Sequence, residues 1–507
     1  MSAAFSMSSI SGQSVRDVID QRAAQAPNQV FLIDPTTRQT LTFRDLHDAA
    51  RVFAARLKAE GCQPGDRIAY AMENGADAVR VLLGAMYGGY VATAINLVSG
   101  LSTISYVLEH SEARLVFVDD NTAASVAEAV GTLTTVPRSI AISTDWFEGE
   151  GSELDSVDAA SDSLLMYTSG TTGKPKGVLH THESILAGGG NTALAHELTS
   201  NDRALCVLPV YHINGLCVTV MGPLVSGGGV LMPQKFSVSS FWNQLRDHAC
   251  TWFSVVPTQI SYLLHHTEKL ADMPDLRFGR SASSALAPDV QSAFESKFDI
   301  PIVETMGLTE TAAQILSNPL PPGTRKIGSP GLAYGNEVLI ADPNQKELPR
   351  GEEGEVIVKG ANVMRVYRNN DAATAASLTE EGWLRTGDLG RMDEDGYIFI
   401  TGRLKELIIK GGENIAPREI DDVLYSHPDV IEAAAFARPC DSYGQTVEAG
   451  VQIHDGSELT EADLLELCRA SVGPFKTPDR IHFLPELPKG PSGKIQRIKL
   501  AELVLAS

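Results

Sequence analysis

The sequence is poor in aromatic residues and in cysteine. Aromatic side chains make up 6% of the 507 residues, and the six cysteines include no C-x-x-C pair. A chain of this length can bury a large core and does not need disulfides for its stability. We therefore expect reduced, mostly buried thiols and a cytoplasmic protein.

Targeting and membrane segments are also missing. The N-terminal stretch MSAAFSMSSISGQSVRDVID has neither the basic start nor the apolar core of a secretory signal, and the C-terminal VLAS is not a peroxisomal signal. The most apolar long run, residues 216–233, is interrupted by glycines and a serine and is short for a bilayer span. We predict that this run is buried core and that the protein has no integral membrane association.

Basic residues are outnumbered by acidic ones. The chain has 41 Lys and Arg against 63 Asp and Glu, which gives a formal net charge of −22. An acidic surface of this kind argues against nucleic acid or an anionic membrane as the main partner. It does not exclude a phosphate ligand, because a local basic loop can still hold phosphates.

The order of expected helices and strands predicts an α/β fold of two or more domains. Short β-rich runs lie at residues 67–72, 114–118, 204–208 and 251–255. Helical patterns lie at residues 42–60, 76–87, 103–109 and 241–248. Such alternation is typical of largely parallel sheets. The runs at 354–358 and 397–400 predict an added antiparallel β region.

A small C-terminal domain follows. From about residue 421 the pattern is that of an α+β domain, with helices expected at 419–426 and 461–471 and strands at 431–437 and 447–453. We place the boundary within residues 400–410. Residues 1–403 then form the large α/β domain, and residues 404–507 form the small α+β domain.

The segment YTSGTTGKPKG, residues 167–177, crowds three glycines, four Ser or Thr hydroxyls and two lysines together. Glycine lets the backbone approach a ligand closely, and free N–H groups, hydroxyls and lysines bind anionic oxygens. The spacing is not that of the P-loop, because only two residues separate Gly170 from Gly173 and Pro175 replaces its Ser or Thr. A flexible surface turn is the alternative, but the density of anion donors favours a polyphosphate-binding loop.

Six further segments are spaced across the chain. They are PVYHING at 209–215, RSASSALAP at 280–288, MGLTE at 306–310, WLRTGDLG at 383–390, GRLKELIIKGGEN at 402–414 and PKGPSGKIQR at 488–497. Together with the loop they resemble the motifs of the adenylate-forming superfamily of acyl-CoA synthetases, peptide-synthetase adenylation domains and luciferases. The resemblance covers nearly all of the chain and implies the adenylate-forming ligase fold.

The resemblance implies an ATP-dependent, AMP-forming carboxylate–CoA ligase. A carboxylate oxygen attacks the α-phosphorus of ATP to give an acyl-AMP and pyrophosphate, and the thiol of CoA then displaces AMP. Two anions meet in the first step, so positioning and charge stabilisation matter more than acid–base catalysis. The implied ligands are a small carboxylic acid, ATP, Mg²⁺ and coenzyme A, bound by a monomer or homodimer.

The resemblance also assigns residues to the nucleotide. Lys494 would be the adenylation lysine, although its position alone would suggest an ordinary surface lysine. Glu310, with Thr168, would bind Mg²⁺, and Thr309 would donate to phosphate. Asp388 would accept hydrogen bonds from both ribose hydroxyls. The other implied nucleotide contacts are Ser169, Gly170, Thr171, Thr172, Gly173, Lys174, Ser283, Ser284, Ala285, Met306, Gly307 and Arg403.

The acid, the thiol and the domain movement have implied residues too. Those for the acid are Tyr211, His212, Asn214, Ser281 and Ala313, and we also count His212 among the catalytic candidates. Those for CoA are Gly411, Gly412, Phe475 and Lys476. Lys405 follows Gly402-Arg-Leu at the position of the hinge about which the small domain turns between the two half-reactions.

The identity of the acid is narrowed by a second resemblance. The stretches FSVSSFWNQLRDHACTWFSVVPTQISYLL, RSASSALAP and SNPLPPG look like the branch that contains oxalate–CoA ligases, and the candidate acid residues are mostly polar. The histidine that oxalate ligases carry after the TE motif is absent from Thr311-Ala-Ala-Gln314. We expect a short polar or dicarboxylic acid. The alternative for the acid is a medium- or long-chain fatty acid, and the alternative for CoA is a carrier-protein thiol. Two other classes of protein are a luciferase-like oxygenase and a non-catalytic nucleotide-binding regulator.

Overall fold

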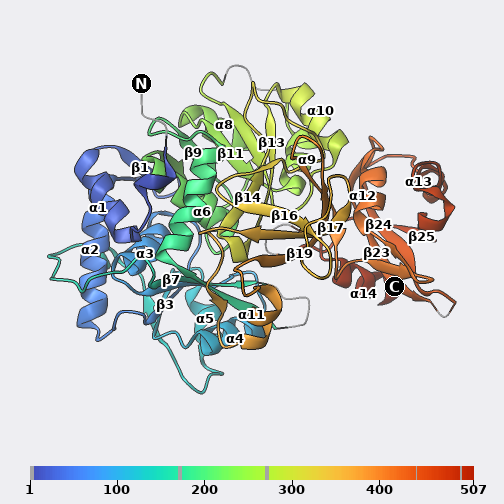
Figure 1. Ribbon diagram of the computed structural model, residues 1–507. Helices are drawn as coiled ribbons and strands as arrows, with labels where there is room; N and C mark the ends of the chain where they lie inside the picture. Colours follow the sequence, from blue (N-terminus) through green and yellow to red (C-terminus); the bar gives the residue numbers. More distant parts are fainter. Residues whose placement is uncertain (1–4, 169–173, 269–272, 441, 491–493, 507) are drawn as a thin grey trace.

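The computed structural model describes residues 5–168, 174–268, 273–440, 442–490 and 494–506 (Figure 1). Its strands form a seven-stranded, a nine-stranded, a four-stranded and a five-stranded sheet. In Figure 1 the N-terminal helices lie at the left and the orange-to-red C-terminal part at the right, with the amber strands β16, β17 and β19 of the four-stranded sheet between them.

The seven-stranded sheet is built mostly from the first third of the chain. Its order is β18 (Val366–Tyr367), β8 (Lys176–Thr181), β7 (Asp162–Thr168), β4 (Val91–Ala94), β3 (Arg67–Ala71), β5 (Leu115–Val118) and β6 (Arg138–Ala141). The strands from β7 to β6 pair in parallel, whereas β7–β8 and β8–β18 are antiparallel. β3, β4 and β5 are almost wholly buried, as expected for parallel strands covered on both faces.

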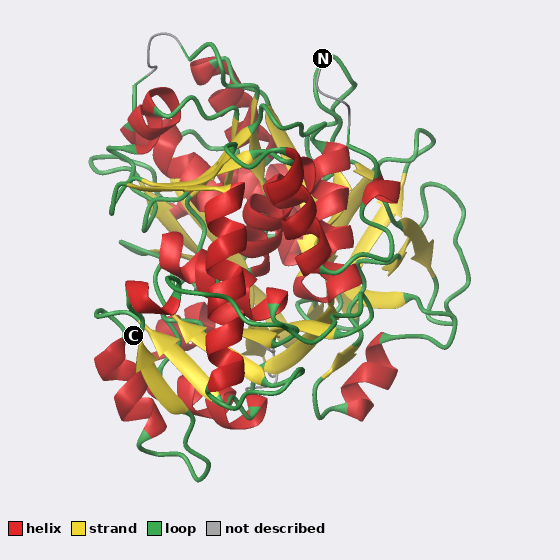
Figure 2. Ribbon diagram, turned by 90° about the vertical axis from the view of Figure 1, so that its left-hand side faces the viewer, coloured by secondary structure: helices red, strands yellow, loops and turns green. Residues whose placement is uncertain are grey.

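Helices cover both faces of this sheet because alternate residues of each strand point to opposite sides. Ile68 and Tyr70 of β3 pack in one hydrophobic cluster with α2 and α3, whereas Ala69 and Ala71 pack in another with α4 and α5. The helices of this part are α1 (Val15–Gln25), α2 (Phe43–Ala59), α3 (Ala76–Tyr87), α4 (Leu101–Ser111) and α5 (Ala123–Val130), with short 3₁₀ turns η1 (Met7–Ser9) and η2 (Thr144–Trp146). Figure 2 shows several of the molecule's helices in front of the strands.

The nine-stranded sheet has the order β15 (Leu332–Ala333), β14 (Ala313–Ser317), β13 (Ile302–Leu308), β12 (Phe278–Ser281), β11 (Trp252–Val255), β9 (Arg203–Cys206), β10 (Gly229–Leu231), β1 (Val30–Asp34) and β2 (Gln39–Thr42). Its central strands are parallel. Helices α8 (Phe241–Asp247), α9 (Pro257–His266) and α10 (Pro288–Phe298) share a hydrophobic cluster with one face.

Helix α6 (His182–Ala195) lies between the two large sheets, where it contacts β7 and β8 of one and β14 of the other. Gly188 permits the close approach, because a Cβ there would stand 2.2 Å from the carbonyl oxygen of Ala312. The helix therefore packs directly against the turn that follows β13. Residues 216–233 lie nearby as parts of a π-helix, η3 (Asn214–Met221), of α7 (Gly222–Ser226) and of β10, and the predicted burial of this run is confirmed.

The last strands of the large part form a four-stranded antiparallel sheet. They are β16 (Glu337–Ala341), β17 (Glu353–Lys359), β19 (Leu384–Met392) and β20 (Ile398–Arg403). Helix α11 (Asp371–Ser377) precedes β19. This sheet is the antiparallel region that the sequence predicted.

The C-terminal part has a five-stranded sheet of β21 (Ile408–Lys410), β22 (Glu413–Ile415), β23 (Val430–Cys440), β24 (Gly444–Ile453) and β25 (Arg480–Phe483). Its helices are α12 (Pro417–Tyr425), α13 (Glu461–Lys476) and α14 (Arg497–Ala506). It has its own hydrophobic cluster around Ile420, Val447 and Leu464. The predicted fold class, a large α/β domain with an antiparallel β region and a small α+β domain, is confirmed. The boundary at 403/404 falls between β20 and β21 and stays a prediction.

The structure also describes the cysteines and the length and hydrophobicity of the helices. All six cysteines are free thiols, five of them buried and Cys440 partly so, as predicted. Within the described ranges, none of the helices combines the length and the hydrophobicity needed to cross a bilayer.

Candidate active site

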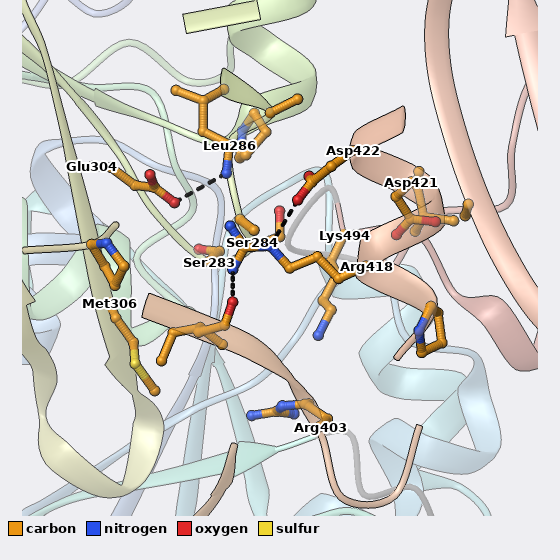
Figure 3. Close-up of a pocket in the computed structure, with 18 of the residues that line it drawn as sticks. Ser283, Ser284, Leu286, Glu304, Met306, Arg403, Arg418, Asp421, Asp422 and Lys494 are labelled. Carbon is orange, nitrogen blue, oxygen red and sulfur yellow. Dashed lines mark hydrogen bonds and ion pairs between the residues drawn. The ribbon is translucent and has the colours of Figure 1, made fainter. Parts of the chain in front are cut away.

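A cavity of about 220 Å³ lies where the C-terminal part meets the large sheets. It is lined from one side by Ser283, Ser284, Ala285, Met306 and Gly307, and from the other by α12, Ile495 and Arg497. Asp388, Arg403 and Lys494 complete the lining. Eight residues that the sequence assigned to the nucleotide or to catalysis therefore meet in one cavity. Figure 3 labels Ser283, Ser284, Met306, Arg403 and Lys494 among them.

Asp388 and Arg403 face each other across the pair of strands β19 and β20, which are in register at these two residues. The guanidinium Nε of Arg403 donates to Oδ1 of Asp388 at 2.5 Å. Burial disfavours the charge of Arg403, but Asp388, Glu406 and Glu310 outweigh it and raise the pKa of the guanidinium. The guanidinium of Arg403 therefore keeps its charge, and the second oxygen and free lone pairs of the Asp388 carboxyl group can accept from a ligand.

Lys494 projects its ammonium into the same cavity (Figure 3). The backbone on both sides of residues 491–493 is held together, because Gly490 N–H donates to the Lys494 carbonyl at 2.7 Å. Burial and Arg403 lower the pKa of Lys494, whereas Glu406, 3.8 Å away, and Asp388 oppose the shift. A partly desolvated ammonium whose ion pair with Glu406 is as long as 3.8 Å is suited to anions brought by a ligand.

The C-terminal part is fixed in this arrangement by contacts with the large part. Lys489 Nζ donates to Tyr262 OH at 2.8 Å and lies 2.9 Å from Oε2 of Glu432. Ser261 donates to the Ile431 carbonyl at 3.0 Å. These bonds connect α9 with β23 and the loop before Lys494, so they hold the lysine in the cavity.

Met306 and Gly307, at the end of β13, form the opposite wall of the cavity. The side chain of Met306 borders the cavity in Figure 3. Gly307 is required by packing, because a Cβ there would lie 1.7 Å from the Ala313 carbonyl oxygen. The glycine thus lets β14 and β13 close together behind the cavity.

Thr309 and Glu310 lie in the 3₁₀ turn η4 (Thr309–Thr311) directly after β13. Oε1 of Glu310 accepts a hydrogen bond from Tyr367 OH at 2.7 Å. The buried His180, whose pKa burial lowers to about 4, bonds through Nε2 to the Thr309 carbonyl at 2.7 Å. The turn is therefore anchored from β8 and β18, and the Glu310 carboxylate is oriented by Tyr367 without an ion pair to any cation among the described residues.

The predicted phosphate loop is described at its two ends. Thr168 ends β7 and is half-buried. Lys174 Nζ lies 5.3 Å from the ring centre of Tyr106, and Lys176 Nζ lies 4.5 Å from that of Tyr367. Tyr367 thus joins Lys176 to Glu310. The predicted contacts Ser169, Gly170, Thr171, Thr172 and Gly173 lie outside the described residues.

The predicted acid residues fall into two groups. Asn214 and Ser281 are buried, and Asn214 donates to Ser283 at the wall of the 220 Å³ cavity at 3.3 Å. Ala313 is buried behind Gly307. Tyr211 instead lines a larger cavity of about 970 Å³, which also borders Thr168, and the ring of His212 lies 5.2 Å from that of Tyr211.

The predicted hinge and CoA residues lie away from the small cavity. Lys405 is exposed in the turn between β20 and β21. Gly411 and Gly412 form the exposed turn between β21 and β22 with positive φ. Lys476 is ion-paired with Glu419 at 2.5 Å, and the exposed Phe475 has Lys410 over its ring. In this arrangement the structure does not bring these four CoA candidates to the nucleotide residues.

Two buried groups at the site were not found from the sequence. Glu304 lines the cavity, with Oε1 accepting from Leu286 N–H at 3.2 Å and a buried Oε2 that has no partner among the described residues. Arg280 begins the RSASSALAP motif, but the sequence predicted no role for it. Both could have been noticed in the sequence, because each is a charged residue inside a run that is otherwise typical of a buried strand.

Comparison with known proteins identifies the family. The model of the AMP-binding enzyme family matches residues 19–368, and that of the AMP-binding enzyme C-terminal domain matches residues 419–494. A sulfoacetate–CoA ligase of Cupriavidus necator is 44% identical and covers 95% of this chain and 96% of its own. An oxalate–CoA ligase of Arabidopsis thaliana is 35% identical, over 91% of this chain and 93% of its own.

A solved structure shares the arrangement. The crystal structure of ATP-bound MatB from Rhodopseudomonas palustris is 28% identical and superposes with a TM-score of 0.89 over 97% of this chain and 99% of its own. The family models and this superposition span both the large part and the C-terminal part. The chain therefore belongs to the family of AMP-binding enzymes, with the family's C-terminal domain included.

Proposed function

We propose that this enzyme joins a short acid that bears a second polar group to CoA. The general activity is that of an acid–thiol ligase, ATP-dependent and AMP-forming, and it uses ATP, Mg²⁺ and CoA. The proposal is supported by a cluster of buried polar side chains behind Ser283. Asn214 is the member of this cluster that donates a hydrogen bond to Ser283. Sulfoacetate, the acid named in the relative from Cupriavidus necator, and oxalate, named in that from Arabidopsis, are the first candidates.

The roles of the cavity residues follow from their charges. Lys494 neutralises the carboxylate and the α-phosphate as these two anions approach each other. Asp388, held by Arg403, accepts hydrogen bonds from the ribose hydroxyls, since a carboxylate offers two acceptors to a vicinal diol. Ser283, Ser284, Ala285 and Met306 border the base.

Glu310 fits a Mg²⁺ site of the kind that nucleotide substrates complete. Within the described residues, no three His, Cys, Asp or Glu side chains gather into a metal-binding cluster. Mg²⁺ in such enzymes is held by one or two carboxylates with substrate phosphates and water. Glu310, which is half-buried and oriented by Tyr367, supplies such a carboxylate, and Thr168 ends the neighbouring strand. The bound ion would offset phosphate charge.

The larger cavity is the route that we propose for the thiol. It borders Tyr211 and Thr168 on the large part and Lys489 and Lys499 on the C-terminal part. Gly411, Gly412, Phe475 and Lys476 reach it only if the small domain turns about Lys405. The thiol-binding role of these four residues therefore belongs to a second arrangement of the domains.

The acid preference has a direct test. Buried Asn and Ser groups left without a partner cost free energy, so an alkyl chain placed against them is disfavoured. We predict that acids of about two to five carbons with a second polar group exceed octanoate and palmitate in kcat/KM by at least ~10²-fold. Pyrophosphate release at saturating ATP and CoA measures the series. A steady rise of kcat/KM with alkyl length would instead favour a fatty acid substrate.

Glu304 leads to a prediction about the base. Its unpartnered carboxylate oxygen is an acceptor, which suits the exocyclic amine of adenine and repels the carbonyl oxygen of guanine. We predict that Glu304→Gln lowers the ratio of kcat/KM for ATP to that for GTP by about 10-fold, because the amide can donate as well as accept. The control is Glu295→Gln. Glu295 forms an ion pair with Arg325 and does not line the cavity. An unchanged ratio in Glu304→Gln would remove Glu304 from base recognition.

A further inference from the structure

Lys494 shares its cavity with two arginines. Figure 3 shows its side chain projecting toward Arg403, and the charges of both Arg403 and Arg497 act against that of its ammonium. A buried ammonium beside other cations loses its proton more readily, because burial and like charges both disfavour the charged form. The proposed role of Lys494 in acyl-AMP formation depends on that charge. The site therefore requires a carboxylate that offsets the two arginines.

Each of these arginines has a carboxylate of its own. Nε of Arg403 donates to Oδ1 of Asp388 at 2.5 Å, across the paired strands β19 and β20. Nη2 of Arg497, at the start of α14, lies 2.5 Å from Oδ2 of Asp421 in α12. Asp388 is thus engaged by Arg403, and Asp421 by Arg497, which leaves the charge of Lys494 to another group.

Glu406 is the second carboxylate that acts on this ammonium. It lies in the turn between β20 and β21, directly after Lys405, and it lines the cavity. Its Oε1 is 3.8 Å from Nζ of Lys494, and its Oε2 is 3.4 Å from Nε of Arg497. Burial disfavours a charge on Glu406, but Lys494, Arg497 and Arg403 outweigh it and lower the pKa of the carboxyl group. Glu406 is therefore a negative charge at neutral pH.

Glu406 belongs to the same part of the chain as Lys494. Both residues, with Arg497, follow the predicted domain boundary at 403/404, whereas Arg403 and Asp388 precede it. Glu406 would therefore stay beside Lys494 when the small domain turns, and Arg403 would not. In the present arrangement the N–H of Glu406 donates to the Arg403 carbonyl at 2.9 Å, which sets the Glu406 carboxylate at the edge of the cavity.

We propose that Glu406 is a positioning residue, which keeps the Lys494 side chain in its ammonium form and directs it into the cavity until the acid and ATP bind. The inference rests on the proposed role of Lys494 and adds the group that keeps this lysine charged. The distance of 3.8 Å is longer than an ordinary hydrogen bond. Lys494 can therefore turn to the substrate anions without first breaking a short ion pair.

Glu406→Gln should lower the pKa of Lys494 further, because the amide lacks the charge that opposes burial and Arg403. Trace labelling with acetic anhydride measures this shift in the enzyme without substrates, since only the neutral amine reacts. Mass spectrometry of the peptide that contains Lys494 gives the extent of labelling at each pH, and the exposed Lys346 is the internal standard. We expect the midpoint of the labelling curve to move to lower pH, with at least ~3-fold more labelling at about pH 8.

The pH dependence distinguishes this role from a merely structural one. A change in the access of the reagent to Lys494 would alter labelling at every pH and leave the midpoint where it is. Removal of a counter-charge instead moves the midpoint, because it changes the equilibrium between ammonium and amine.

The rate of acyl-AMP formation provides a second measurement. The ammonium is lost as pH rises through the pKa of Lys494, so a lower pKa makes the alkaline loss of activity begin at lower pH. Acid-dependent ATP–pyrophosphate exchange with sulfoacetate and with oxalate is compared at about pH 7 and about pH 9. We expect the ratio of the rate at the higher pH to that at the lower pH to be at least ~5-fold smaller in Glu406→Gln than in the parent enzyme.

Further variants assign the effect to the carboxylate of Glu406. Glu406→Ala should move the labelling midpoint in the same direction and replaces Glu406→Gln if that variant does not fold. Glu406→Asp keeps the charge and should keep the midpoint close to that of the parent. Glu466→Gln is the matched control, because Glu466 is an exposed carboxylate of the small domain that does not line the cavity. An unchanged midpoint in Glu406→Gln and Glu406→Ala, or an equal shift in Glu466→Gln, would overturn the proposal.

The outcomes separate this inference from the role on which it rests. If Lys494→Ala keeps normal exchange, the proposed role of Lys494 is wrong, whatever the labelling shows. If Lys494→Ala loses exchange but Glu406→Gln keeps the labelling midpoint of the parent, the role of Lys494 stands and that of Glu406 is wrong.

Discussion

Lys494→Ala should lower the rate of acyl-AMP formation by at least ~10²-fold, the scale for removing one electrostatic contact from a transition state. The ammonium lies in the cavity beside Asp388 and Arg403, and no other lysine lines that cavity among the described residues. The second half-reaction, from synthetic acyl-AMP and CoA, should persist because it does not bring two anions together. Acid-dependent ATP–pyrophosphate exchange measures the first step, and thioester formation from synthetic acyl-AMP measures the second.

The control for this variant is Lys346→Ala, which removes an exposed lysine from the turn between β16 and β17. Both half-reactions should be unaffected there. Near-normal exchange in Lys494→Ala would mean that another group balances the charge of the meeting anions. Equal loss of both half-reactions would indicate damage to the fold instead of a role in adenylation.

Lys405→Pro should impair one half-reaction far more than the other. Lys405 is exposed and does not have a positive φ, so proline can replace it without disturbing the core. Proline fixes φ and thereby limits rotation of the small domain. Because Lys494 lies in the nucleotide cavity in the present arrangement, we expect acyl-AMP formation to be largely retained and thioester formation to fall by at least ~10²-fold.

Lys405→Ala is the matched control, since it removes the charge but leaves the backbone free to rotate. It should keep both half-reactions. Circular dichroism and thermal unfolding verify that the proline variant is folded. A folded Lys405→Pro enzyme with the same loss in both steps would contradict the hinge assignment.

Much of the fold could be predicted because the periodicity of these segments is strong. The helix predicted at 76–87 is α3, and the strand predicted at 67–72 is β3, one residue shorter. The buried parallel strands are runs of β-branched and small apolar residues, which leave little ambiguity. In the site, the roles of Asp388, Arg403 and Lys494 could be predicted because each residue lies in one of several motifs that are spaced along the whole chain.

The acid-binding part could not be predicted in the same way. Arg280 lies in a strand between small residues, and its sequence neighbours do not reveal that it is buried or that Asn214 and Gln314 are its partners. Those contacts join η3, β12 and β14, which are brought together by the pairing of strands in the nine-stranded sheet and by the packing of η3 against β14. Glu304 was missed for the same reason, since its free oxygen becomes visible only when the walls of the cavity are in place.

The central claim is that the enzyme couples a short acid that bears a second polar group to CoA, with ATP cleaved to AMP and pyrophosphate. The most direct measurement quantifies all products of one incubation with ATP, Mg²⁺, CoA and either sulfoacetate or malonate, by liquid chromatography and mass spectrometry. We predict that AMP, pyrophosphate and the thioester of at least one of these acids form in equal amounts, and that octanoate and palmitate give far less. Formation of ADP and phosphate, or of thioester from palmitate but from none of the short acids, would contradict the account.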